Sequence, residues 1–284
     1  MKYLKSLLRL LLMFTLGLGV GSCNEKHMNE NHINNNKSAG EFLGHSGYKA
    51  ISYGGYRTLT REDQPSIAQI KEDLKILSAL GVKVIRTYNL QLDQAPNILK
   101  AIRALKSEEV GFEMYVMLGL WIECENARLS PNHGAEDTAV NSAEIERAIT
   151  YANQYPDIVK IIAVGNEAMV HWQAAYFVLP SVILKWVNHL QKLKTEDKLP
   201  SELWITSSDN FASWGGGEAA YHNEDLTALI KAVDYISLHT YPFHDTHYNA
   251  GFWVDSQKNT AHLETKACVE LAVQSAVDLS LIHI

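Results

Sequence analysis

The sequence predicts an α/β fold, a (β/α)8 TIM barrel that is incomplete in this chain, and three observations support this prediction. Short apolar segments alternate with longer segments whose apolar residues recur at helical spacing. Strands that are separated by helices form parallel sheets, because parallel neighbours need a long connection. Polar and aromatic side chains also follow nearly every predicted strand, at the end where a barrel carries its active site. An open doubly wound sheet is the alternative, although it would concentrate such groups at one crevice.

The first 47 residues are predicted to lie outside the barrel. Three basic residues precede an apolar stretch over 10–20, which is typical of a signal peptide covering residues 1–22. The stretch closes with Val20-Gly21-Ser22-Cys23, which resembles a bacterial lipobox and implies acylation of Cys23. Residues 23–47 are mostly polar and are predicted to form a flexible tether. The protein is therefore expected to be exported and lipid-anchored to a membrane of the bacterial cell envelope, at the outer membrane or the cell surface.

The predicted barrel domain begins at residue 48 with three pairs of strand and helix. Ser66 and Gly81 bound the first helix, because Ser is a good N-cap and Gly ends helices. The predicted strands and helices alternate as follows: strand 50–56, helix 66–80, strand 82–88, helix 95–105, strand 112–121 and helix 142–155.

Three further pairs follow: strand 159–167, helix 181–194, strand 203–210, helix 226–232, strand 234–243 and helix 266–278. Residues 279–284 begin a seventh apolar segment. A closed barrel needs eight units, and about six and a half are present. The domain over 48–284 is therefore predicted to be truncated before the end of strand seven.

Composition and missing motifs exclude several classes of function. The formal net charge of -7 provides no basic surface, which argues against nucleic acid as a partner. Neither GxGxxG nor GxxxxGK[ST] is present, so no nucleotide cofactor is expected. His239, His244, Asp245 and His247 match no metal-ligand spacing, so no metal is expected either. A neutral or polar ligand fits this chain better.

The most informative motif is Gly165-Asn166-Glu167, two polar residues at the tip of a buried strand. The competing interpretation is that Glu167 caps the next helix. Two other strand ends carry polar motifs, Arg86-Thr87-Tyr88 and His239-Thr240-Tyr241. In chain order, these segments resemble strands two, four and six of family-17 glycoside hydrolases, which are β-1,3-glucan-cleaving or glucan-rearranging enzymes of clan A. The resemblance covers about residues 48–284.

The resemblance implies a retaining mechanism in which two carboxyl groups lie roughly 5 to 5.5 Å apart. Glu167 corresponds to the acid/base that protonates the departing glycosidic oxygen. Asn166 corresponds to the residue that binds the sugar 2-hydroxyl. Arg86 orients the nucleophile or adjusts its electrostatic environment, and Tyr241 donates a hydrogen bond to it. His239 lies on the floor of the same active site. A structural ion pair inside the barrel is the competing interpretation of Arg86.

The family's nucleophile is a Glu at the end of strand seven, which the resemblance places just beyond Ile284. Glu264 and Glu270 are poor substitutes, because they lie before and within the last predicted helix and not at a strand tip. The chain as written is therefore expected to lack its nucleophile, and activity is expected of a longer parent protein.

Aromatic residues at the predicted barrel mouth are candidates for sugar binding, since aromatic faces suit the apolar faces of pyranose rings. Trp121 is the main one, with a place in the core as its alternative. The weaker candidates are Tyr53, Tyr88, Asp209, Trp172 and Trp214. Two other functions stay open: a non-catalytic carbohydrate-binding surface lipoprotein, and another clan A activity such as a β-mannanase. Cys124 and Cys268 are expected to be free buried thiols.

Overall fold

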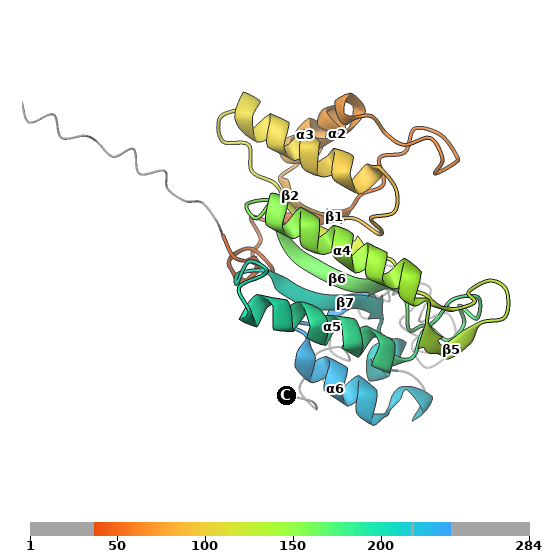
Figure 1. Ribbon diagram of the computed structural model, residues 1–284. Coiled ribbons are helices and arrows are strands. Elements are labelled where there is room, and N and C mark those ends of the chain that lie inside the picture. Colours follow the sequence, from red (N-terminus) through yellow and green to blue (C-terminus); the bar gives the residue numbers. More distant parts are fainter. Residues whose placement is uncertain (1–36, 217–218, 240–284) are drawn as a thin grey trace, which may run out of the picture. The chain divides into compact units, whose positions relative to one another are not determined.

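The computed structural model describes residues 37–216 and 219–239, which form an α/β fold (Figure 1). Six parallel strands make one curled sheet in the form of a half-barrel, in the order β1-β2-β3-β6-β7-β8. These strands are β1 Lys49–Ser52, β2 Val82–Arg86, β3 Tyr115–Leu120, β6 Val159–Asn166, β7 Trp204–Asn210 and β8 Ser237–His239. The predicted parallel sheet is thus confirmed within the described residues.

The five α-helices of the described residues lie along one face of the sheet (Figure 1). They are α2 Ile67–Ala79, α3 Gln94–Glu108, α4 Thr138–Gln154, α5 Pro180–Thr195 and α6 Glu224–Ala232. The predicted start of α2 is confirmed, since Ser66 Oγ accepts from Gln69 N at 3.3 Å while Gln69 Oε1 accepts from Ser66 N at 2.9 Å. Helix α4 begins four residues earlier than predicted, because Asp137 caps its first turn by accepting from Val140 N at 3.0 Å.

Alternate side chains of each strand point to the two faces of the sheet. On β3, Val116 and Leu118 belong to the main core between the sheet and its helices. Tyr115 and Met117 belong to a second, smaller core on the opposite, inner face. This inner face ends at the C-terminal ends of the strands, which form the mouth of the half-barrel. The candidate site lies at this mouth.

A short antiparallel hairpin was not predicted and follows β3. It consists of β4 (Cys124–Glu125) and β5 (Asn132–Glu136). Neither strand shows an apolar alternation, so the sequence pattern contains no signal for it. Three short helical turns complete the described elements: η1 Ala39–Glu41, η2 Ala212–Gly216 and η3 Ala219–Tyr221.

The segment 37–47 is packed against the sheet, which differs from the predicted tether. Ala39 and Phe42 are fully buried, and the Phe42 ring stacks on Tyr115 with 4.8 Å between centroids. The composition of this segment is polar overall, but two apolar side chains suffice to dock it when they meet the inner core. Residues 37–47 therefore belong to the packed domain and not to the predicted tether.

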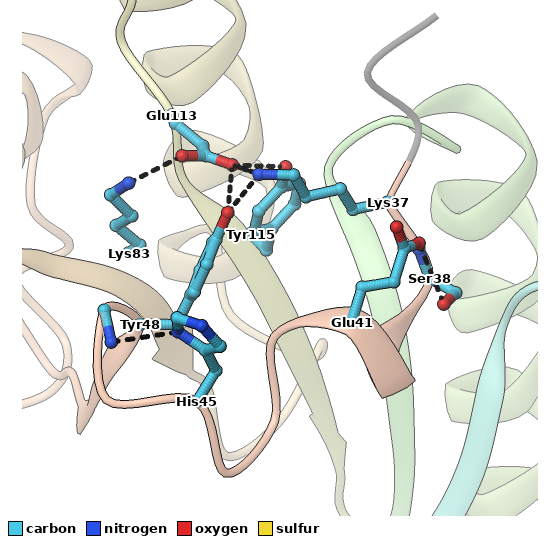
Figure 2. Close-up of polar contacts among 9 residues, drawn as sticks. Lys37, Ser38, Glu41, His45, Tyr48, Lys83, Glu113 and Tyr115 are labelled. Atoms are coloured by element: carbon cyan, nitrogen blue, oxygen red, sulfur yellow. Dashed lines mark hydrogen bonds and ion pairs between the residues drawn. The ribbon is translucent and has the colours of Figure 1, made fainter.

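Glu113, just before β3, ties this segment to the N-terminal end of the sheet (Figure 2). Its carboxylate accepts hydrogen bonds from Lys83 Nζ at 2.7 Å, Tyr115 Oη at 2.8 Å, Lys37 Nζ at 2.9 Å and Tyr48 Oη at 3.0 Å. Partial burial raises the pKa of Glu113, but these donors outweigh burial and lower its pKa to about 2. This network lies at the N-terminal ends of the strands. In a barrel, residues at that end serve stability, and residues at the opposite end serve catalysis.

Several predicted features fall outside the described residues. These are the signal peptide, Cys23, residues 240–243 of the sixth predicted strand with Tyr241, the helix over 266–278 with Cys268, and residues 279–284. Cys124 is a buried free thiol. Across residues 37–216 and 219–239, no helix combines the length and apolar character needed to cross a bilayer.

Candidate active site

A bulge at the end of β6 brings Asn166 and Glu167 onto the inner face. The pairing of β6 with β7 shifts register between Ala163 and Asn166, and Gly165 adopts a φ of +89°. A Cβ on Gly165 would lie 2.9 Å from the Cβ of Ala168, so only glycine fits there. Glu167 itself has a φ of +48°, a conformation that costs a side-chain-bearing residue roughly 1 to 2 kcal/mol. Strain of this kind is typical of functional positions.

The backbone N–H of Glu167 donates to the carbonyl of Ser208 on β7 at 2.9 Å, which fixes the strained turn. The Glu167 side chain is 24% exposed, and its Oε1 lies 2.9 Å from Nδ1 of His239 on β8. Helix α5 begins at Pro180 with Leu179 as its N-cap, so Glu167 does not cap the next helix. The carboxyl group is therefore accessible and positioned by three adjacent strands.

Arg86, at the end of β2, reaches across the mouth to Asn166. Its Nη2 donates to Asn166 Oδ1, which fixes the orientation of the Asn166 amide and leaves its NH2 group as the donor. The Arg86 guanidinium also lies over the ring of Tyr88, 5.1 Å from the centroid. The structure thus brings together five of the residues predicted from sequence: Arg86, Tyr88, Asn166, Glu167 and His239.

Asp209 lies beneath this cluster and is fully buried, so it offers no surface to a sugar. Its carboxyl oxygens accept from the backbone N–H groups of Met169 and Asn210, both at 2.8 Å. Burial raises the pKa of Asp209 to about 7, and the nearby charge of Glu167 adds to this effect. The predicted role of Asp209 in substrate binding is therefore corrected: it holds the loop that follows Glu167. Trp214 is likewise 2% exposed and belongs to the core.

Tyr53 is also placed away from the mouth, contrary to its predicted role. Its hydroxyl donates to Asp73 on α2 at 2.6 Å, and the residue is only 8% exposed. Tyr53 follows the end of β1, and its side chain points toward the layer of helices and packs in the main core. Trp121, by contrast, is partly exposed after the end of β3, and its ring lies 4.9 Å from that of Tyr176.

Comparison with known proteins decides the family. The model of the BtgE/BtgC glycoside hydrolase domain matches residues 50–271, most of the chain. This chain belongs to the BtgE/BtgC glycoside hydrolase family. A search of curated protein sequences finds no match.

Solved structures include a relative of this BtgE/BtgC glycoside hydrolase, the crystal structure of an endo-laminarinase from Formosa Hel1_33_131. The two chains are 54% identical with a TM-score of 0.81, over 87% of this chain and 65% of that chain. This chain therefore spans less than two thirds of the laminarinase chain. CJP38, a beta-1,3-glucanase and allergen of Cryptomeria japonica pollen, matches at 13% identity and a TM-score of 0.48, over 72% of this chain and 59% of that chain.

The BtgE/BtgC domain also contains functional candidates that the sequence pattern did not indicate. Glu123, Arg128 and Tyr176 surround Trp121, and they lie in or beside the unpredicted hairpin and the loop after β6. No periodic signal marks such loop residues, although a Glu two positions after Trp121 is visible in the sequence. In the part of the chain that the structure describes, no group of three or more His, Cys, Asp or Glu is arranged to hold a metal ion.

Proposed function

We propose that this protein is a retaining glycosidase of family 17 that cleaves or rearranges β-1,3-linked glucan with Glu167 as its acid/base. One observation carries the proposal: a strained bulge at the C-terminal end of β6 presents an accessible Glu167 between Asn166 and His239. The 54% identity to a protein described as an endo-laminarinase supports the choice of substrate. The complete fold proposed for the parent protein is an eight-unit barrel.

The mechanism divides the work between two carboxyl groups. In the first step the nucleophile, a Glu that we place just beyond Ile284, attacks the anomeric carbon while Glu167 gives its proton to the departing oxygen. In the second step water attacks the glycosyl-enzyme and loses its proton to Glu167, which restores both groups. A sugar hydroxyl in place of water gives transfer instead of hydrolysis.

The neighbouring side chains orient these groups. Arg86 fixes the amide of Asn166 so that its NH2 group is directed to the sugar 2-hydroxyl, a contact that strengthens in the transition state. His239 holds the Glu167 carboxyl group through the contact of 2.9 Å. Tyr241, outside the described residues, is assigned the hydrogen bond to the nucleophile.

Product analysis of the full-length protein tests this function. Incubation with laminarin is expected to release β-1,3-linked oligosaccharides whose new reducing ends keep the β configuration, as followed by proton NMR. Mixed-linkage glucan and mannan serve as comparison substrates. Release of α-configured products would refute the retaining mechanism, and cleavage of mannan without cleavage of laminarin would refute β-1,3-glucan as substrate.

We also propose export and lipid anchoring through Cys23, with the envelope membrane as a partner, on the basis of the lipobox-like motif. The full-length protein is expected in the membrane fraction of the bacterial cell, and Cys23→Ala is expected to release it. Equal membrane recovery of both forms would refute the anchor.

A further inference from the structure

Residues 37–47 cross the base of the half-barrel, which is the end formed by the first residues of its parallel strands. Tyr115 and Trp204 are the first residues of β3 and β7. The Phe42 ring stacks on the Tyr115 ring with an angle of 2° between their planes. A Cβ on Gly40 would lie 3.0 Å from the Trp204 ring, so the backbone of the segment runs directly over the start of β7. The segment therefore covers the end of the half-barrel that lies opposite its mouth.

Lys37 fixes the start of this segment to the same base (Figure 2). Its Nζ donates to Glu113 Oε1 at 2.9 Å and to the hydroxyl of Tyr48. Glu113 lies two positions before β3, and its Oε2 pairs with Lys83, the second residue of β2, at 2.7 Å. The chain therefore enters the packed domain at the base and not at the mouth.

The segment is also held by bonds within itself. Glu41 Oε2 accepts from Ser38 N at 2.7 Å, and Leu43 N donates to the carbonyl of Ala39 at 2.9 Å. Ala39 and Phe42 are fully buried in the inner core. Residues 37–47 are therefore a fixed part of the base.

The chain between the lipobox-like motif and this fixed point is short. Residues 24–36 separate Cys23 from Lys37. Since an extended chain advances about 3.5 Å per residue, Cys23 and Lys37 lie at most about 50 Å apart. Without docking of 37–47, the first fixed residue would be Lys49 at the start of β1, and this limit would rise to about 90 Å. Docking thus nearly halves the reach of an anchor at Cys23.

We propose that residues 37–47 act as a clamp that holds the base of the half-barrel toward a lipid bilayer, so that the mouth with Glu167 opens away from it. This inference rests on the lipid anchor at Cys23 proposed above, and it defines which end of the domain faces its membrane partner. A mouth that opens away from the bilayer admits long polymer chains, whereas the bilayer would obstruct a mouth that faced it.

The test places one fluorescent probe at the base and one at the mouth of the full-length mature protein. Val110→Cys carries the probe in the loop before β3, and Leu129→Cys carries it in the hairpin after β3; both positions are exposed. Cys124 and Cys268 are replaced by alanine, so that the probe reacts with the new thiol. The protein is bound to phosphatidylcholine vesicles that contain a rhodamine-labelled lipid as energy acceptor.

Energy transfer is expected to place the base probe about 10 to 20 Å nearer to the bilayer than the mouth probe, because the six residues of β3 rise about 20 Å. Equal transfer from the two probes, or stronger transfer from the mouth probe, would overturn the proposed orientation. This comparison of probes needs no change in residues 37–47.

Two variants test whether the docked segment is the clamp. Phe42→Ala removes the buried ring, and Glu113→Gln weakens the pairing with Lys37. Each is expected to lower energy transfer from the base probe about twofold, because the reach of the chain grows from about 50 to about 90 Å. Glu125→Gln, at an exposed glutamate of β4, is the matched control and is expected to change nothing. Circular dichroism verifies that each variant is folded, and unchanged transfer in both folded variants would refute the clamp.

A second attachment separates the orientation from the lipid anchor. In this protein six histidines replace Cys23 and bind vesicles that contain a nickel-chelating lipid. If the acylated protein is not recovered with membranes but the nickel-held protein shows the base probe nearer, the anchor fails and the orientation set by the base stands. If the nickel-held protein shows no difference between the probes, the orientation fails whether or not Cys23 is acylated.

Discussion

Glu113→Gln is expected to weaken the attachment of the segment 37–47 to the sheet (Figure 2). The pKa of Glu113 falls from its ordinary value of 4.5 to about 2, which corresponds to about 3 kcal/mol, since each tenfold change is about 1.4 kcal/mol. The carboxyl group is 25% exposed and partly screened by water. We therefore expect a loss of about 2 kcal/mol in the free energy of unfolding at pH 7, measured by urea denaturation.

The loss of stability caused by Glu113→Gln is also expected to depend on pH and to become smaller as pH falls. A carboxyl group with a lowered pKa in the folded state stabilises the protein above its unfolded pKa, near 4.5, and that contribution disappears as pH falls toward about 2. The stability difference between the wild type and Glu113→Gln is thus expected to be constant above about pH 5 and to shrink below it. Glu125→Gln, at an exposed glutamate of β4, is the control. A difference that stays the same at pH 3 and pH 7 would refute the argument.

Three further predictions concern the residues that position the site. Gly165→Ala is expected to cost about 2 to 4 kcal/mol of stability and to lower activity on laminarin, because the new Cβ would lie 2.9 Å from Ala168; unchanged urea midpoint and kcat would contradict this. Asp209 has a raised pKa of about 7, so its ionisation makes the folded state less stable as pH rises from about 4 to about 7; Asp209→Asn is expected to remove that slope in thermal melts, and an identical slope would contradict it. Glu144→Gln is expected to cost about 1 to 3 kcal/mol in urea denaturation, because it replaces the buried carboxylate oxygen that accepts from Arg147 with an NH2 group, and an unchanged urea midpoint would contradict it.

The sequence was sufficient to predict the sheet and the tip of β6 because both depend on local patterns. Buried β-branched runs identify strands, and a Gly-Asn-Glu end is conspicuous after such a run. The cap at Ser66 is equally local. The cluster of Arg86, Asn166 and His239 followed from a rule of the fold, since parallel strand ends meet at one edge.

Side-chain direction at the strand ends could not be predicted in the same way. Tyr53 and Asp209 each follow or end a strand, but one points to α2 and the other is buried under a loop. Their orientation depends on where the pairing of each strand stops or shifts, as at the bulge before Asn166. The packing of 37–47 depends on contacts with β3, about 70 residues further along, which composition does not contain.

Glu167→Gln in the full-length protein tests the central claim most directly. The substitution preserves the shape of the side chain but removes the proton that the glycosidic oxygen needs, so kcat on laminarin is expected to fall by about 10² to 10⁴-fold. Aryl glucosides, whose leaving groups need no protonation, are expected to lose much less in the first step, and oligosaccharide binding is expected to persist. Glu125→Gln controls for the loss of a surface charge. A laminarin rate equal to that of the wild type would remove Glu167 from the mechanism and contradict the account.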